Sequence, residues 1–388
     1  MAERAAVAIY RDRLLPPSET FVLAQAESLR RFNPYYLGSR VVQGLALPPE
    51  RALVVNRGDL ASKLGEASHQ LFGWEPGFAR RVRKLGPVLI HAHFGPDGVR
   101  ALPLSRALGV PLVVTFHGYD VTIKDEYARR SFYSHRVYVR RRDVLKREGR
   151  LFVAVSEFVR EKLVEQGFPS EKIVVHHIGV DVETFRLDPG VTREPVVLFV
   201  GRLVEKKGCE YLIRAMSRVQ SAMPEAELVV IGDGPLRSSL ERLAGKTLRR
   251  HRFLGTQPPS GVRAWLNRAS VFCVPSITAA SGDAEAFGLV FAEAQAMELP
   301  VVSFASGGVP EAVAHGETGF LAAERDWKGL AEHLSTLLKD DALRRRFGAA
   351  GRARVRARFD LRKQTPKLEE LYERVLREPE TTNGASVG

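Results

Sequence analysis

The chain has 388 residues, 45% of them hydrophobic and 27% charged, which is ordinary for a globular protein and too long for one hydrophobic core. It lacks an apolar run of ~20 residues and a signal-like segment near its start, and its two cysteines are too few for a disulfide framework or metal cluster, so we expect a cytoplasmic protein of two domains. The 58 basic residues exceed the 45 acidic ones by 13, which predicts attraction to anions without choosing among nucleic acid, lipid and small molecules.

The start of the chain is typical of a doubly wound sheet. Residues 5–10 are short and apolar, and we expect them to form a buried first strand. Ser18 is expected to cap a helix that begins just after it. In folds that open with a strand, a loop and a helix, ligands bind at the carboxyl end of the strand.

Histidines follow the next two predicted strands. His91 and His93 come after an apolar run and share one face, so they could bind a metal, but no third ligand is near and a structural or ligand-lining role is favoured. His117 ends the predicted strand 111–115 and precedes Gly118. This position suits a side chain that faces a crevice; a buried core histidine is the alternative.

Residues 129–150 are crowded with arginine and lysine. Tyr133, Val137 and Val144 fall on one helical stripe, so the segment can form a basic amphipathic helix that lies on an anionic membrane. The alternative is a basic face exposed to water. The chain carries neither an aromatic RNA-binding motif nor a helix-turn-helix pattern, and we expect no nucleic-acid partner.

The alternation of strands and helices restarts in the second half of the chain. Residues 186–195 are the best candidate for a linker, and an apolar strand follows at 196–200. Gly201, Arg202 and Lys207 come next, in the loop before a helix. The guanidinium of Arg can donate two parallel hydrogen bonds to an oxyanion, and Lys adds a compact positive charge. This pair could therefore bind a diphosphate without a metal.

The stretch 281–297 brings two carboxylates close to a predicted helix start. Glu285 is expected in the loop or first turn, and Glu293 about two turns inside the helix. The free N–H groups of residues 286–289 would then offer a positive site for a phosphate. The alternative is a capping Glu285 and a solvated Glu293. A ligand that is anionic at one end and rich in hydroxyls elsewhere, such as a nucleotide sugar, suits the first interpretation.

Taken together, these motifs resemble the retaining glycosyltransferases of family 4. The resemblance rests on Glu285 and Glu293 with seven residues between them, on Gly201-Arg202 with Lys207-Gly208, on Phe116-His117-Gly118, and on residues 154–157, 179–181, 232–234 and 316–319. It covers nearly the whole chain in the right order. Residues 18–21 and 91–94 look most like the bacterial exopolysaccharide, colanic-acid-type branch.

The resemblance implies an α/β fold of the GT-B type, with two Rossmann-like domains facing across a cleft. The N-terminal domain, residues 1–187, would bind the acceptor. The C-terminal domain, residues 188–365, would bind the nucleotide sugar. A last helix at about 366–380 would cross back onto the first domain.

The resemblance also implies retaining, metal-independent transfer of a hexose from a nucleotide-diphosphate sugar, with UDP- and GDP-sugars as first candidates and no cofactor. The acceptor would be a polysaccharide precursor or a glycolipid. The basic segment 129–150 would let the protein reach such an acceptor from the inner face of the plasma membrane. The alternative is a small soluble acceptor, such as a natural product or a sugar phosphate.

The family's residue roles carry over to matching positions. Arg202 and Lys207 would hold the diphosphate, Glu293 the ribose and Glu285 the donor sugar, with His117 beside the reacting carbon. The donor would touch Gly201, Arg202, Lys207, Phe253, Leu254, Glu285, Phe287, Gly288, Leu289 and Glu293; Ser18, Glu19, Thr20 and His117 would lie on the acceptor side.

Two departures from the family pattern carry expectations of their own. Many relatives have glycine where this chain has Ala286, and the methyl group is expected to crowd the sugar and narrow the choice of donor. Glu19 would repel a diphosphate and is therefore expected to face the acceptor.

Overall fold

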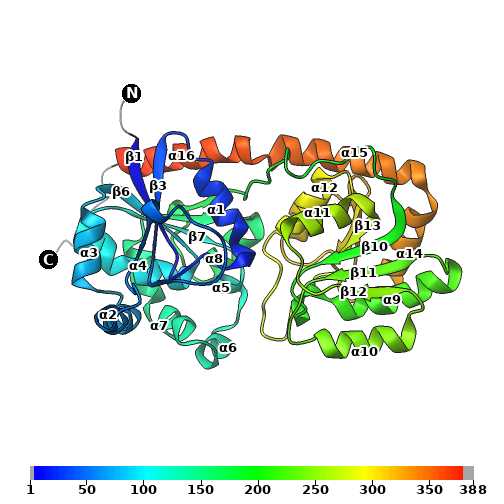
Figure 1. The fold of residues 1–388 in the computed structure, drawn as a ribbon, viewed down its shortest axis with the longest axis horizontal. Coiled ribbons are helices and arrows are strands. Elements are labelled where there is room, and N and C mark those ends of the chain that lie inside the picture. The colour runs from blue at the N-terminus through cyan, green and yellow to red at the C-terminus, as the bar shows by residue number, and fades with distance from the viewer. Residues whose placement is uncertain (1–3, 379–388) are drawn as a thin grey trace.

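A sheet of seven parallel strands forms the framework of the N-terminal half in the computed structural model, which describes residues 4–378 (Figure 1). Its order is β5-β3-β1-β6-β7-β8-β9. The strands are β1 (Ala5–Tyr10), β3 (Phe32–Gly38), β5 (Ala52–Val54), β6 (Pro87–His93), β7 (Leu112–Phe116), β8 (Leu151–Ala154) and β9 (Ile173–Val175). A short two-stranded sheet pairs β2 (Arg13–Leu14) with β4 (Arg40–Val41).

A second parallel sheet of six strands forms the framework of the C-terminal half, in the order β12-β11-β10-β13-β14-β15. Its strands are β10 (Glu194–Val200), β11 (Glu227–Ile231), β12 (His251–Phe253), β13 (Ala269–Cys273), β14 (Val301–Phe304) and β15 (Gly319–Ala322). Two parallel sheets confirm the predicted α/β class. In each sheet the winding direction reverses once, between β1 and β6 and between β10 and β13, and ligands bind at the carboxyl ends of strands beside such a reversal.

Helices cover both faces of the first sheet, and alternate residues of β1 therefore pack into different cores. Val7 and Ile9 pack on the side of α1 (Thr20–Glu27) and α16 (Leu361–Arg377). Ala8 and Tyr10 join the larger core on the other side. That core is covered by α3 (Pro76–Arg83), α4 (Gly95–Leu108), α7 (Tyr133–Glu148) and α8 (Glu157–Glu165).

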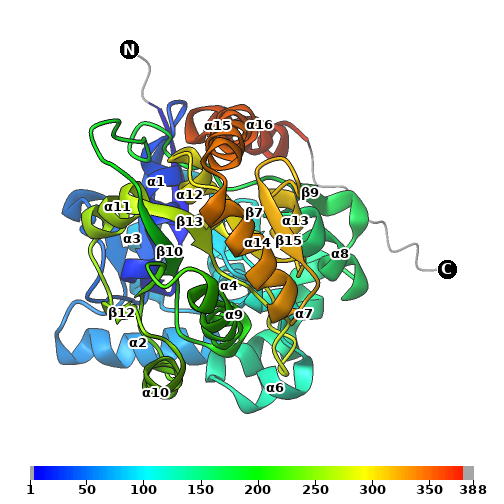
Figure 2. The ribbon, with the colours of Figure 1, turned by 90° about the vertical axis from the view of Figure 1, so that its right-hand side faces the viewer.

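The remaining helices complete the two halves seen in Figures 1 and 2. The first half adds α2 (Leu60–Phe72), α5 (Tyr119–Thr122) and α6 (Asp125–Arg130). The second half has α9 (Cys209–Ala222), α10 (Arg237–Thr247), α11 (Pro259–Arg268), α12 (Leu289–Ala296), α13 (Val309–Ala312), α14 (Trp327–Lys339) and α15 (Asp341–Arg358). No helix among residues 4–378 is both long and apolar enough to cross a bilayer.

The chain crosses between the halves twice, and the two crossings pair with each other. Val180 donates its N–H to Phe359 O at 2.7 Å and accepts from the N–H of Leu361 at 2.9 Å, so residues 180 and 360 form a parallel bridge. After this crossing α16 runs along the first half (Figure 1). It begins at Leu361, five residues before the predicted start near 366, because Asp360 accepts the N–H of Arg362. Residues 379 and 380 of the predicted helix lie outside the described residues.

One local expectation is wrong, and the structure shows where the apolar stripe of the segment 129–150 lies. Ser18 caps no helix: residues 17–19 form a 3-10 turn, α1 starts at Thr20, and no side chain caps it. The apolar stripe of α7 does not form a free face. Val137 and Val144 pack against the core and Tyr138 and Leu145 are buried, while Tyr133 is exposed. The outward face of α7 therefore carries mainly its arginines.

Candidate active site

A loop that follows β7 in the first half and one that follows β13 in the second meet where the halves touch. Gly118 follows β7 and Ala286 precedes α12, and a Cβ added at Gly118 would lie 2.7 Å from the Cβ of Ala286. Gly118 has φ +126°, which side chains rarely tolerate. The methyl of Ala286 thus packs toward Gly118 in the other half of the molecule. That it also crowds the donor sugar stays a prediction.

Glu285 and Lys207 form a buried ion pair at this junction. Lys207 Nζ donates to Glu285 Oε2, and Ser276 Oγ donates to the same oxygen at 3.4 Å. Burial raises the pKa of Glu285, but Lys207 and Lys206 outweigh it and hold that pKa below its usual value. The stem of Lys207 lies 3.6 Å from the position of a Cβ at Gly201, so the lysine passes close to this glycine.

Arg202 lies in the same loop as Lys207 but has a different environment. Its side chain is exposed and forms no hydrogen bond or ion pair within residues 4–378. The loop therefore presents one cation held by Glu285 and one that is free to meet an anion. That Arg202 holds a diphosphate stays a prediction.

The segment before α12 presents backbone N–H groups without partners. Residues 286, 287 and 288 donate to no protein group in the described part of the chain, and α12 starts at Leu289 with Gly288 in the left-handed region at φ +78°. Phe287 itself is buried among core residues. Such N–H groups at a helix start suit a phosphate.

Glu293 lies in the second turn of α12, one turn earlier than expected, because the helix starts only at Leu289. Burial alone raises its pKa to about 7. Its carboxylate has no protein partner within residues 4–378, so it is available for hydroxyl groups. Phe253 and Leu254, expected beside the base, are partly exposed at the carboxyl end of β12.

Glu293→Gln should stabilise the protein at high pH. In the folded state the carboxyl keeps its proton up to about pH 7, whereas in the unfolded chain it loses it near pH 4.5. The free energy of unfolding therefore falls as the pH rises through this window, and glutamine avoids that loss. We expect a gain on the order of 1–2 kcal/mol at pH 8 and none at pH 4.5, measured by urea unfolding. An equal difference at both pH values would contradict the assignment.

His117 lies across the junction in an aromatic setting. Its ring centroid is 4.9 Å from that of Phe21 and 4.5 Å from that of Phe94. Its Nε2 lies 3.0 Å from Nδ1 of His93, while its own Nδ1 is buried with no protein partner among residues 4–378. Burial lowers the pKa of both histidines well below the usual value, so both are neutral at pH 7.

His91 serves the framework, as favoured from the sequence. Its Nδ1 lies 2.6 Å from Tyr372 Oη on α16, and its Nε2 lies 2.6 Å from Thr115 Oγ1. It therefore ties the sheet to the last helix. Residues 4–378 contain no group of three His, Cys, Asp or Glu side chains placed to hold a metal ion.

We expect His93→Leu to lower kcat about tenfold, because His117 loses the hydrogen bond that fixes its tautomer and one buried nitrogen is left unsatisfied. His93→Asn, whose amide can take the place of Nδ1, should recover most of the rate. Steady-state kinetics of sugar transfer, with thermal unfolding as a check of folding, distinguish the two. If asparagine and leucine are equally slow, His93 acts only in packing.

Asp120 is a site residue that the motif analysis missed. Its carboxylate accepts the N–H groups of Gly118 and Gly95 at 2.9 Å and of His117 at 3.2 Å, and so it shapes the turn that carries His117. Burial raises its pKa to about 6 despite these bonds. The available signal was an aspartate two residues after a glycine at a strand end, a common turn-forming arrangement.

The residues expected on the acceptor side differ in exposure. Ser18 and Thr20 are exposed, but Glu19 is buried and accepts Nε and Nη2 of Arg11 at 2.8 and 2.6 Å. Arg11 also pairs with Asp97 and lies 4.4 Å above the ring of Phe94. Glu19 therefore does not face an acceptor: a buried carboxylate keeps its charge only beside a cation, and Arg11 is the cation it has.

Glu311 on α13 connects the two halves. Its carboxylate accepts the N–H groups of Glu157 and Phe158, at 2.9 and 3.0 Å, at the start of α8 in the other half, and lies 3.2 Å from His177 Nε2. Burial raises the pKa of Glu311, but these hydrogen bonds outweigh it and the pKa is lowered. Ser156 Oγ adds a bond of 2.6 Å to the carbonyl of Ala286.

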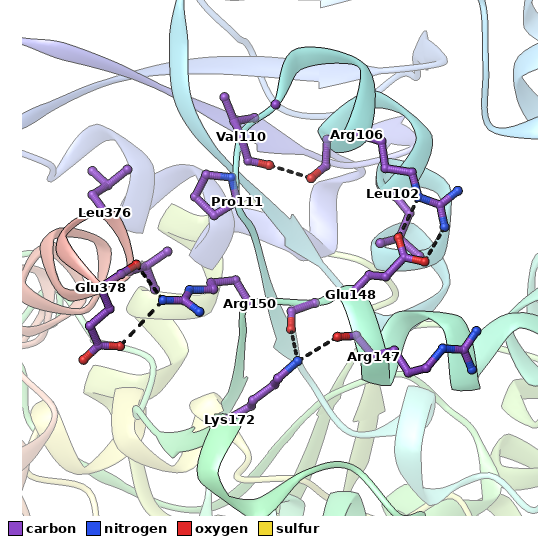
Figure 3. A pocket seen from close by; sticks show the side chains of 14 residues that line it. Leu102, Arg106, Val110, Pro111, Arg147, Glu148, Arg150, Lys172, Leu376 and Glu378 are labelled. Carbon is purple, nitrogen blue, oxygen red and sulfur yellow. Dashed lines mark hydrogen bonds and ion pairs between the residues drawn. The ribbon is translucent and has the colours of Figure 1, made fainter. Parts of the chain in front are cut away.

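A cavity of about 690 Å³ lies away from this junction, at the opposite ends of β7 and β8 (Figure 3). Two of its charged side chains are bound to neighbours: Arg106 pairs with Glu148, and Lys172 donates to the carbonyl oxygens of Arg147 and Gly149. None of the predicted site residues lines it. The junction of the halves therefore remains the candidate active site.

Family models match both halves of the chain. One described as glycosyl transferases group 1 matches residues 182–354, and one described as glycosyltransferase family 4 matches residues 41–184. The chain is 34% identical over 261 residues to WcaL of Salmonella typhimurium, a protein assigned to colanic acid biosynthesis as a glycosyltransferase. This match covers 64% of the chain and 61% of WcaL, less than two thirds of that relative's length.

A second relative is matched over more of its length. The GDP-mannose-dependent alpha-(1-6)-phosphatidylinositol monomannoside mannosyltransferase of Mycolicibacterium smegmatis is 30% identical over 322 residues, 76% of this chain and 80% of that protein. Among solved structures, Anabaena Alr3699/HepE in complex with UDP and glucose has a TM-score of 0.77 at 20% identity, covering 96% of this chain and 100% of that one. At that identity the likeness shows the fold alone.

Proposed function

The chain belongs to glycosyltransferase family 4, and from that premise we propose that it moves a sugar from a nucleotide-diphosphate sugar to an acceptor hydroxyl, with retention of configuration and without a metal ion. One observation carries the proposal: the buried pair of Lys207 and Glu285 lies beside the unpartnered N–H groups of residues 286–288, with neutral His117 across the junction.

The charges suit the departure of a diphosphate. When the bond between the sugar carbon and the diphosphate oxygen breaks, negative charge grows on the leaving oxygens and positive charge on the sugar ring. Lys207, Arg202 and the N–H groups would stabilise the first, and the carboxylate of Glu285 the second. The acceptor oxygen then bonds to the same face of the carbon, and its proton passes to the leaving diphosphate. Glu285, already paired with Lys207, is not assigned as a nucleophile.

Relatives support the class of acceptor. WcaL is assigned to colanic acid, a polysaccharide, and the Mycolicibacterium enzyme is named for a phosphatidylinositol mannoside. We propose a polysaccharide precursor or a glycolipid as the acceptor for this chain, and a UDP- or GDP-sugar as the donor. Glu293 would bind the ribose hydroxyls through its free carboxylate.

Thermal unfolding with UDP, GDP and ADP tests the donor side. A nucleotide at 100 times its Kd adds about 2.7 kcal/mol to the free energy of unfolding, a readable increase in Tm. We expect UDP or GDP to raise the Tm equally with and without a chelator. Absence of a shift with every nucleotide, or sugar transfer that requires added manganese, would overturn the proposal.

A further inference from the structure

Helix α2 (Leu60–Phe72) presents its leucines to water. Leu60, Leu64 and Leu71 are 76%, 68% and 51% exposed, and Ala67 between them is exposed as well. These positions follow the spacing i, i+4, i+7, i+11, which places them on one face of a helix. Scattered exposed leucines are ordinary, but a continuous stripe on one helix is not.

The opposite face of α2 is polar and buried. Ser62 is 6% exposed, Glu66 is 7% exposed and His69 is fully buried. Glu66 accepts from Asn56 Nδ2 at 2.6 Å and from Gln70 Nε2 at 3.0 Å, and His69 Nε2 lies 2.7 Å from Tyr10 Oη. The usual arrangement is therefore inverted, and these hydrogen bonds fix the helix with its apolar stripe outward.

The same edge of the molecule carries further exposed aromatic side chains and cations. Figures 1 and 2 both place α2, α6 and α7 along the lower side of the N-terminal half. Six of the ten large hydrophobic side chains exposed among residues 4–378 belong to these segments, so the apolar exposure is concentrated here. They are Leu60, Leu64, Leu71, Tyr127, Phe132 and Tyr133, of which Phe132 is 78% exposed.

The cations of this edge are not neutralised by the protein. Arg129, Arg130, Arg136, Arg140 and Arg141 are exposed and form no ion pair within the described residues. By contrast, Arg142 pairs with Asp125 and Lys146 with Asp143. Unpaired arginines that border an apolar stripe suit a surface that is anionic at its boundary and apolar beneath.

We propose that this edge, formed by the leucine stripe of α2 with Phe132 and the arginines of α6 and α7, docks the protein on a bilayer that contains anionic lipids. The leucines and Phe132 enter the boundary between headgroups and acyl chains, while the arginines contact the headgroups. Only the role of this docking depends on the proposed function: it would bring the enzyme to an acceptor held at the membrane.

Sedimentation with vesicles tests the docking without any nucleotide or acceptor. We expect the wild-type protein to bind vesicles of phosphatidylcholine with phosphatidylglycerol, and to bind phosphatidylcholine alone far more weakly. The variant Leu60→Ser, Leu64→Ser, Leu71→Ser should lose at least about tenfold in partition coefficient. Arg136→Glu with Arg140→Glu should lose a similar factor at low salt, with a smaller difference at high salt.

The matched control replaces two exposed apolar side chains elsewhere, Val164→Ser with Leu376→Ser, and should bind like the wild type. Thermal unfolding and the nucleotide-induced shift in Tm show that each variant is folded and that its donor site is intact. The docking is overturned, even if sugar transfer is observed, when the wild-type protein does not bind anionic vesicles. It is also overturned when the leucine variant binds them as strongly as the wild type. A wild-type dimer that the leucine variant converts to monomer without vesicle binding overturns it too, since the stripe would then join two copies.

Discussion

Lys207→Met is expected to lower kcat for sugar transfer by about 100- to 1000-fold. Lys207 Nζ is bonded to the buried carboxylate of Glu285 and lies beside the N–H groups that precede α12. The substitution keeps the length of the side chain but removes the cation that would neutralise the leaving diphosphate. It also leaves Glu285 buried without its strongest counter-charge, so the pKa of that carboxyl rises.

Loss of stability could imitate loss of catalysis in this variant, because a buried carboxylate without its partner destabilises the fold. The double variant Lys207→Met, Glu285→Gln removes both charges and should recover the Tm while its rate remains low. The neighbouring Lys206, which pairs with Asp283 at 2.9 Å, supplies the control: Lys206→Met should keep most of the rate. A Lys207 variant as fast as the Lys206 variant would exclude Lys207 from the chemistry.

Glu311→Ala is expected to reduce kcat/KM by about 10- to 100-fold, although the sequence motifs assign no role to Glu311. The substitution leaves two N–H groups at the start of α8 without their acceptor from the other half, and it removes the partner of His177. The closed arrangement that brings Gly118 against Ala286 then loses a charge-assisted connection. Steady-state kinetics and the radius of gyration from solution scattering measure the two consequences.

Glu317→Ala is the matched control for Glu311, because it removes an exposed carboxylate six residues along the chain that makes no bond to the first half. It should leave both the rate and the radius unchanged. If Glu311→Ala has the same radius and rate as the wild type, the contact does not hold the halves together.

The family and the fold class could be predicted because they depend on residues close in sequence. Short apolar strands followed by glycine, His117 or Lys207 identify parallel strands and the loops at their carboxyl ends. The comparison with known proteins confirms the family, and the two parallel sheets confirm the class.

The misses concern partners that are distant in sequence. Glu19 was expected to face an acceptor because nothing in the sequence pairs it with Arg11, and Asp97, which completes that cluster, is 78 residues further on. Glu311 likewise acts on residues 154 positions away. Helix α12 starts at Leu289, later than expected, because Gly288 adopts a left-handed backbone conformation, which composition alone does not predict.

Helix α16 completes the core of the first half: Leu368, Tyr372 and Val375 are buried together with residues of β1 and β6, and Tyr372 bonds to His91. The first sheet is therefore synthesised some two hundred residues before the helix that covers one of its faces. During translation the part of this face that α16 covers stays exposed, although α1 is already present, so the first half cannot finish folding as it leaves the ribosome. Ribosome-bound chains arrested at residue 358 should bind an apolar dye that released, full-length chains exclude.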